Sequence, residues 1–168
     1  MSCEACLEYI VQARNCKDCG NYNLFGKGLI PVLKKINHLG IAVNDLEKAI
    51  EIFTKAFNLE VGGIEEVPSQ QVKVAFLPIG ESRIELLEPT SEDSAVSKFL
   101  ATRGEGVHHV AFETDCIVDS LKTAEAQGLR LIDKEPRPGA HGTKVAFMHP
   151  KSTCGVLIEL VEEDTEQS

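Results

Sequence analysis

The chain contains one pattern twice, and this internal repeat constrains the fold more than any other feature of the sequence. Three pairs of segments match in the same order along the chain: 38–43 with 109–113, 73–78 with 144–148, and 84–88 with 158–162. The first two pairs are 71 residues apart, and the third is 74 apart because the second hairpin loop is longer. Three collinear matches indicate a duplicated module of about 55 residues.

Each copy predicts one strand, one helix and three further strands. The expected strands lie at 36–43, 61–66, 71–78 and 83–88 in the first copy, and at 107–113, 129–133, 143–148 and 155–162 in the second. Asn44 or Asp45 can cap the first helix, and the second runs over about 117–127, where Gly128 ends it. A short helix is expected at 94–102, between the copies. The predicted fold class is α+β, with two βαβββ modules.

Charge is divided unevenly along the chain. The first 35 residues carry five basic and three acidic side chains, whereas the whole chain has a net charge of −9, so the remainder carries −11. This contrast indicates an appendage followed by a separate domain. The expected organisation is an N-terminal extension at 1–35, a duplicated domain at 36–162 with modules at about 36–88 and 107–162, and an acidic tail at 163–168.

Four cysteines lie in the extension with the spacing C-x2-C-x9-C-x2-C: Cys3, Cys6, Cys16 and Cys19. Two pairs of thiolates can close a tetrahedral zinc site, although the loop between these pairs is shorter than in zinc ribbons. The other interpretation is a leader with incidental or redox-labile thiols. The sequence leaves both interpretations open.

The composition argues against several classes of partner. An acidic chain with 5% aromatic residues and no Trp lacks the basic surface and the stacking platforms that nucleic acid binding uses. Binding to an anionic membrane also requires a basic protein surface. No stretch reaches the ~18–20 apolar residues of a membrane span. No export signal is recognisable, so we expect a cytoplasmic protein, with the mitochondrial matrix as the alternative. A small molecule is the expected partner.

Four residues that can carry chemistry fall at equivalent positions in the two copies. His38 and His109 begin equivalent strands, and Glu85 and Glu159 lie inside equivalent apolar strands. Because side chains alternate along a strand, each Glu points away from the apolar face of its strand. A carboxylate buried in a cavity must be paired or bound to metal, since an isolated buried charge is very costly. Two His and two Glu suit a divalent metal such as Co, Ni, Mn or Zn.

The alternative is that each His faces solvent and each Glu lies on the polar face of an amphipathic strand. This simpler explanation is favoured for any one of the residues alone. Four of them at equivalent positions favour a shared cavity instead. Gly40 and Ala42, which share a strand face with His38, leave room for one.

Three further histidines are weaker candidates. His108 precedes His109, but the repeat aligns His108 with Asn37 and therefore assigns the site position to His109. His141 and His149 have no histidine counterpart in the first copy, and His149 is expected to order the turn at 148–151.

Several motifs resemble a known family, and they lie in the segments 36–43 (INHLGIAV), 84–89 (IELLEP), 106–110 (GVHHV), 147–152 (FMHPKS) and 155–160 (GVLIEL). They are similar to the vicinal oxygen chelate superfamily and, within it, most like the methylmalonyl-CoA epimerase family. The resemblance runs over about 36–162 and does not cover 1–35. It implies a curved sheet in which both modules enclose one metal cavity, with a homodimer as the expected assembly.

The resemblance also implies a reaction. Members of this family interconvert (2R)- and (2S)-methylmalonyl-CoA by removing and returning the proton at C2, through an enolate that a divalent metal stabilises. The implied metal ligands are His38, Glu85, His109 and Glu159. By the same resemblance, Glu159 would also act as one of the two acid/base groups.

The second acid/base group is left open between two residues. Lys73 stands where some family members carry a Glu, and it could serve if desolvation and the metal lowered its pKa, although a charged Lys on a strand is more often exposed. Gln71 shares a strand face with Lys73 and could position a water instead. The sequence contains no argument that chooses between them.

Two other functions use the same fold. A glyoxalase I-type lyase would act on a glutathione hemithioacetal with the same metal-binding residues. A metal-free binding module would sequester a small molecule and would need neither His38 nor Glu159. Methylmalonyl-CoA epimerisation is the function we expect.

Overall fold

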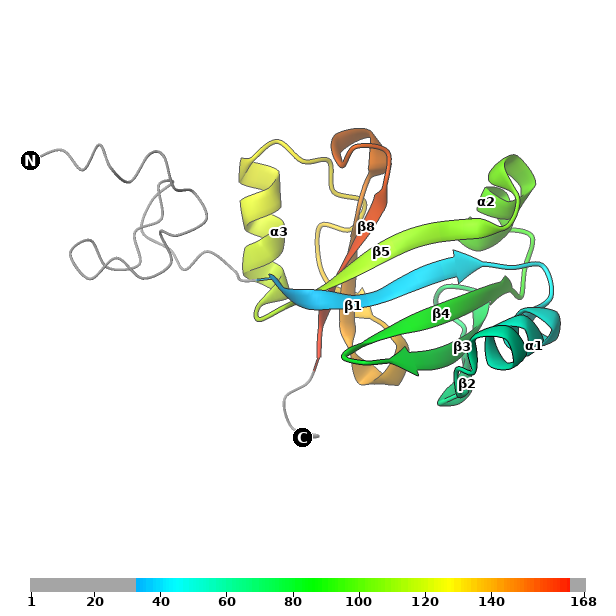
Figure 1. Ribbon diagram of the computed structural model, residues 1–168. Coiled ribbons are helices and arrows are strands. Elements are labelled where there is room, and N and C mark those ends of the chain that lie inside the picture. Colours follow the sequence, from blue (N-terminus) through cyan, green and yellow to red (C-terminus); the bar gives the residue numbers. More distant parts are fainter. Residues whose placement is uncertain (1–32, 164–168) are drawn as a thin grey trace, which may run out of the picture. The chain divides into compact units, whose positions relative to one another are not determined.

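The computed structural model describes residues 33–163, whose strands all belong to a single sheet in the order β2-β3-β4-β1-β5-β8-β7-β6 (Figure 1). The elements are β1 (Leu33–Ala42), α1 (Leu46–Phe57), β2 (Gly63–Val67), β3 (Val72–Ile79), β4 (Ser82–Pro89), α2 (Ala95–Arg103), β5 (Gly106–Thr114), α3 (Ile117–Ala126), β6 (Arg137–Pro138), β7 (Lys144–Met148) and β8 (Leu157–Glu162). Single 3-10 turns lie at Ala140–Gly142 and Pro150–Ser152. The predicted α+β class is confirmed.

The two modules meet where β1 pairs with β5, and this pairing is antiparallel. Within each module the first strand pairs with the last one in parallel, β1 with β4 and β5 with β8. Gly40 lies opposite Glu85 in the first module, and Ala111 lies opposite Glu159 in the second. Both pairs join the strand that carries the histidine to the strand that carries the glutamate. The repeat in the sequence is therefore a repeat of strand register.

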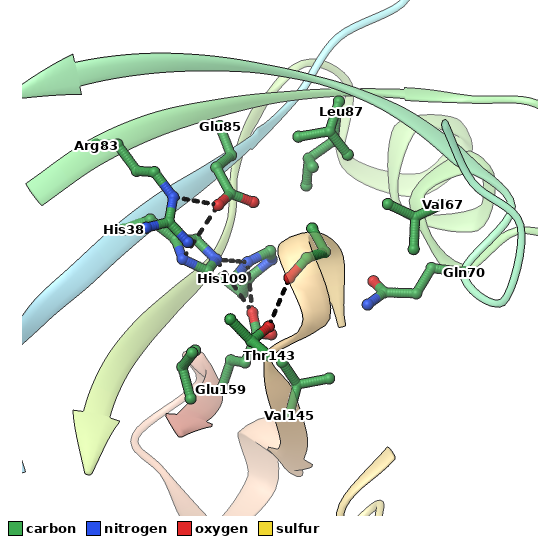
Figure 2. A pocket seen from close by; sticks show the side chains of 13 residues that line it. His38, Val67, Gln70, Arg83, Glu85, Leu87, His109, Thr143, Val145 and Glu159 are labelled. Atoms are coloured by element: carbon green, nitrogen blue, oxygen red, sulfur yellow. Dashed lines mark hydrogen bonds and ion pairs between the residues drawn. The ribbon is translucent and has the colours of Figure 1, made fainter. Parts of the chain in front are cut away.

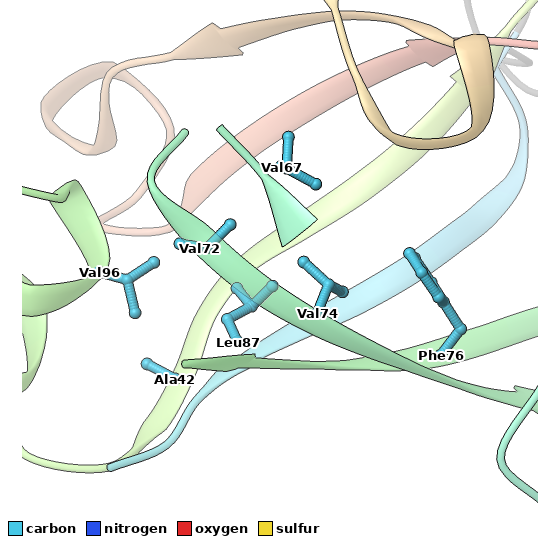
Figure 3. Packing of buried hydrophobic residues seen from close by; sticks show 7 residues of the cluster. All are labelled: Ala42, Val67, Val72, Val74, Phe76, Leu87 and Val96. Atoms are coloured by element: carbon cyan, nitrogen blue, oxygen red, sulfur yellow. The ribbon is translucent and has the colours of Figure 1, made fainter. Parts of the chain in front are cut away.

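Side-chain alternation separates the two faces of the sheet. On β3, Val72, Val74 and Phe76 belong to a cluster on the inner face, where Figure 3 shows them with Leu87 and Val67. Ala75 and Leu77 point the other way, into a cluster that includes residues of α1. The second module repeats this division, because Val145 and Phe147 face inward and Ala146 and Met148 pack with α3. Helices α1 and α3 thus cover the outer face, whereas α2 packs through Val96 against the inner-face cluster, and the rest of the inner face lines a pocket.

Local sequence explains the start of α1, but not that of α3. The Asp45 side chain accepts a hydrogen bond from the Lys48 backbone N–H, as the capping prediction required. Helix α3 begins without a side-chain cap from Cys116, and the Ile117 N–H donates to the Glu162 carboxylate instead, at 2.8 Å. The acceptor for this helix terminus is thus supplied by β8, far along the chain.

The strand expected at 129–133 is the one element that was wrongly predicted. Leu131 forms only an isolated bridge to Met148. The strand that pairs with β7 on the side away from β8 is the two-residue β6. Pro136 and Pro138 explain the shortness of β6, because proline has no backbone N–H to donate to a ladder.

The first strand also starts earlier than predicted. Strand β1 starts at Leu33, before the expected residue 36, because its first residues pair with β5 near Thr114. The proposed metal site of Cys3, Cys6, Cys16 and Cys19 lies outside the described residues, and so does the tail from 164 onward. None of the helices within 33–163 is long and apolar enough to cross a membrane.

Replacing Leu86 by Ala tests the packing of α1 on the outer face. Leu86 is fully buried in the cluster beneath α1, so we expect the free energy of unfolding to fall by about 2–5 kcal/mol. Urea unfolding followed by circular dichroism measures this change. Ile52→Ala is the control, because Ile52 is 50% exposed and its loss should cost under about 0.5 kcal/mol. Equal losses in the two variants would contradict this assignment of the core.

Candidate functional site

Three side chains from three strands converge in a pocket on the inner face (Figure 2). His38 comes from β1, His109 from β5 and Glu159 from β8, and all three are buried. The two histidine Nε2 atoms are 3.0 Å apart, and Glu159 Oε2 lies 3.2 Å from that of His38 and 2.9 Å from that of His109. One potential ligand atom from each residue thus faces a single point, with all three atoms within 4.8 Å of one another.

Glu85 lines the same pocket but faces a different part of His38. Its Oε1 atom lies 3.3 Å from His38 Nδ1, the ring nitrogen turned away from His109, and accepts a hydrogen bond from Arg83 Nε at 2.7 Å. Figure 2 shows the Glu85 carboxylate joined by dashed lines to Arg83 and to His38. The structure therefore brings all four repeat-equivalent residues into one pocket, with Glu85 beside the converging group of three. The role of Glu85 as a fourth metal ligand stays a prediction.

The charge on Glu159 depends on its two histidine neighbours. Burial alone would raise the pKa of this carboxyl, but attraction and hydrogen bonds from His109 and His38 lower its pKa to about 2. Glu159 is therefore an ionised carboxylate at neutral pH. His108 behaves in the opposite way, because burial and the neighbouring His109 lower its pKa to about 4, so its ring is neutral.

Gly40 makes room for one of the histidine rings. A Cβ atom at this position would lie 2.2 Å from His109 Cε1 and 2.5 Å from its Nδ1, which no real contact tolerates. Gly40 stands directly opposite His109 in the β1–β5 pairing, so the ring lies across the backbone of the neighbouring strand. The small residue that the sequence analysis associated with a cavity is therefore needed for the ring itself.

The rest of the pocket wall is mostly apolar, with three polar exceptions. Its apolar members are Val67, Val74, Leu87, Ala140, Val145 and Val161. The polar ones are Gln70, Arg83 and Thr143, none of which was predicted as a site residue. Arg83 could have been found from sequence, because it lies two residues before Glu85 and therefore on the same strand face. Gln70 and Thr143 lie in connections between strands, where no periodicity indicates direction.

Lys73 and Gln71 are not brought into this pocket. Lys73 alternates with Val72 and Val74, which face inward, so it shares the outer face with Ala75. Gln71 is exposed at the turn before β3, with a φ of 55°. Neither residue is therefore placed to act directly on a substrate in this pocket. The residue of this segment that does line the pocket is Gln70, one position earlier.

The two other histidines serve the connections. His149 accepts a hydrogen bond from the Lys151 N–H at 3.0 Å, and it thus orders the turn as predicted. His141 belongs to the 3-10 turn of the second module and packs against Phe76 of the first, with ring centroids 4.3 Å apart. Neither residue is among those that line the pocket.

The donor set fits a divalent transition metal. Two imidazole nitrogens and one carboxylate are ligands that Zn, Co, Ni and Mn accept, and three protein ligands are typical of catalytic rather than structural sites. The carboxylate is ionised and each Nε2 points toward it, so the group needs no rearrangement of strands to bind a cation. Figure 2 shows these side chains grouped on one side of the pocket.

Comparison with known proteins connects this pocket to a family. The family described as Glyoxalase/Bleomycin resistance protein/Dioxygenase superfamily matches residues 37–147. The mitochondrial methylmalonyl-CoA epimerase of Bos taurus is 37% identical over 136 residues, which are 80% of this chain and 78% of that protein. The ethylmalonyl-CoA/methylmalonyl-CoA epimerase of Cereibacter sphaeroides is 36% identical over 131 residues, covering 77% and 98% of the two chains.

A solved structure agrees with these sequence relatives. A methylmalonyl-CoA epimerase in complex with methylmalonyl-CoA and NH4+ superposes with a TM-score of 0.78 at 41% identity. The match covers 82% of this chain and 99% of the other. The match therefore extends over both modules.

Replacing Gly40 by Ala tests whether His109 must lie over β1. The added methyl group overlaps the ring, so we expect Co²⁺ or Zn²⁺ to bind about 10–100-fold more weakly. Titration calorimetry of the metal-stripped protein measures this affinity. Gly63→Ala on β2 is the matched control, because a Cβ there meets nothing within 4 Å. Unchanged affinity in a folded Gly40→Ala protein would show that the His109 ring is not held in this place.

Proposed function

Because the chain belongs to the methylmalonyl-CoA epimerase family of the glyoxalase/bleomycin resistance protein/dioxygenase superfamily, we propose that it interconverts (2R)- and (2S)-methylmalonyl-CoA. The observation that carries the proposal is the buried convergence of His38, His109 and Glu159 from both modules. The proton at C2 lies between a thioester and a carboxylate, and its removal and return invert the centre. A buried, charged and largely apolar pocket suits that chemistry.

The proposed ligands of a divalent metal, Co, Ni, Mn or Zn, are His38, His109 and Glu159, with Glu85 as the fourth. When bound, such an ion would polarise the thioester carbonyl and stabilise the negative charge that the enolate carries. The substrate is an anion and the chain is acidic, so positive charge at the pocket has to come from that ion and from Arg83, which also lines the wall.

The chain's own residues would handle the proton and exclude water. We assign one acid/base role to Glu159, whose ionised carboxylate can accept the C2 proton from one side of the substrate. Val74, Val145 and Val161 give the pocket an apolar wall against which a methyl substituent can pack. Burial of the charged group keeps bulk water away from the carbanionic carbon, which strengthens electrostatic interactions there.

The second proton-transfer role belongs to the opposite side of the substrate. Since Lys73 and Gln71 do not line the pocket, we propose that Gln70 positions a water that carries this proton. Figure 2 shows its carboxamide extending from the rim toward the pocket, on the side away from Glu159. The role that the sequence analysis gave to Gln71 thus moves by one residue.

The predicted homodimer and the cytoplasmic or mitochondrial location stay predictions, and so do the cysteine-bearing extension at 1–35 and the domain limits.

Exchange of the C2 proton for deuterium tests the main proposal. NMR of methylmalonyl-CoA in D2O should show exchange with the wild-type protein, and a chelator should abolish it until Co²⁺ is returned. Glu159→Gln should slow exchange by about 10²–10⁴-fold, because it removes the carboxylate that accepts the proton. Glu66→Gln is the control, since Glu66 is exposed on β2.

The outcomes separate the alternatives. No exchange in folded, metal-loaded protein would reject the epimerase. Turnover of a glutathione hemithioacetal by the same preparation would then identify a lyase. Binding of a small molecule without metal and without dependence on Glu159 would identify the metal-free module.

Replacing Gln70 by Ala tests the second proton-transfer side. Loss of one hydrogen bond to the proposed water should lower kcat for epimerisation about tenfold, with a smaller change in KM. Gln71→Ala is the matched neighbour and should leave kcat unchanged, because its side chain is exposed at the turn. A stopped assay of the two epimers by chiral chromatography measures both variants. Equal effects at the two positions would contradict this assignment.

A further inference from the structure

We propose that Asn37 and His108 are positioning residues, which hold the protons of His38 and His109 on Nδ1 and thereby present both Nε2 atoms to the pocket centre. Each of them directly precedes the histidine that it contacts. The inference rests on the proposed function in one respect, because a metal site is the reason for which both Nε2 lone pairs have to be available.

The first contact fixes the direction of a hydrogen bond. Asn37 Oδ1 lies 2.9 Å from His38 Nδ1, and an amide oxygen can only accept. The opposite end of the amide settles its orientation, because Asn37 Nδ2 donates to Glu113 Oε2 at 3.3 Å and to Glu163 Oε1 at 2.8 Å. A flipped amide would turn its oxygen toward two carboxylates. His38 Nδ1 must therefore carry a proton.

One of the carboxylates behind Asn37, that of Glu113, is itself held in place. Glu113 is buried and lies 3.5 Å from Lys34 Nζ and 3.3 Å from Lys35 Nζ. Asn37 is fully buried, so it cannot exchange these partners for water. Glu85 also approaches His38 Nδ1, at 3.3 Å, but it is shared with Arg83. Asn37 is thus the acceptor that remains if Glu85 turns to another partner.

The second contact does the same for His109 with a different residue. The Nδ1 atoms of His108 and His109 are 3.0 Å apart, so a hydrogen bond between them needs one nitrogen to donate and the other to accept. His109 Nε2 faces Glu159 and His38, so a ligand role requires its proton on Nδ1, with His108 as acceptor. The His108 ring packs edge-on against Phe99 of α2, with centroids 5.1 Å apart, which limits its rotation.

The two contacts occur at equivalent positions of the repeat. Asn37 and His108 occupy equivalent positions in the two modules, and each has an acceptor atom within reach of the next residue's Nδ1. Both modules therefore place an acceptor behind the site histidine, although the residue type differs. Such outer partners typically change metal affinity by about 10–100-fold when removed.

Reciprocal substitution at 108 tests the proposal. His108→Leu removes the acceptor, whereas His108→Asn introduces the group that the first module uses. We expect the affinity for Co²⁺, measured by competition with a chelator, to fall about 10–100-fold in His108→Leu and to recover largely in His108→Asn. Thermal unfolding shows whether both variants fold. Asn37→His, which introduces the group that the second module uses, and Asn37→Leu form the corresponding pair in the first module.

A second readout does not depend on activity. Long-range ¹H–¹⁵N NMR of the histidine side chains distinguishes a proton on Nδ1 from one on Nε2. In Zn²⁺-loaded wild-type protein we expect Nδ1–H on both rings, and in Zn²⁺-loaded His108→Leu we expect His109 to lose this preference. Nε2–H as the dominant form of either ring in the Zn²⁺-loaded wild type, or equal Co²⁺ affinity in His108→Leu and wild type, would overturn the proposal. A protein that passes these tests but does not epimerise methylmalonyl-CoA would instead reject the proposed function alone.

Discussion

The antiparallel pairing of β1 with β5 is the interaction on which the site depends. It joins two four-stranded modules into one sheet, and it places His38 and His109 on adjacent strands. Each module alone would carry one histidine and one glutamate, which are too few to hold a metal ion firmly. The pairing therefore completes the site at the same step that completes the sheet. Gly40 shows how closely the two are coupled, because the His109 ring lies over its backbone.

Burial of these polar groups has to be offset by the contacts that they make. Every buried polar side-chain atom in the described residues has a hydrogen-bond partner. Glu159 is paired with two histidines, and Glu85 is paired with Arg83 and His38. Removing one partner would leave another buried group unpaired, which costs more than the contact itself stabilises. The pocket is thus a connected network, and substitutions within it will not be additive.

Periodicity explains which parts of this arrangement could be predicted. Alternation placed Glu85 and Glu159 opposite the apolar face of their strands, and helical spacing with a capping Asp45 located α1. The same reasoning did not locate Gln70 or Thr143, because connections have no period from which a direction follows. It also assigned a strand to 129–133, where the sequence is apolar enough but the structure forms only an isolated bridge at Leu131.

The repeat alone singled out the four candidate residues and the order of elements, because a duplication preserves local spacing and therefore preserves which residues correspond. Only the tertiary structure decided how these residues face one another. It directs Glu85 to His38 Nδ1, moves the candidate water-positioning role to Gln70, and places Asn37 and His108 behind the histidines. Those relations join residues that lie on different strands or depend on side-chain rotation. Strand pairing and burial determine such relations, and neither can be read from the spacing of residues along one chain.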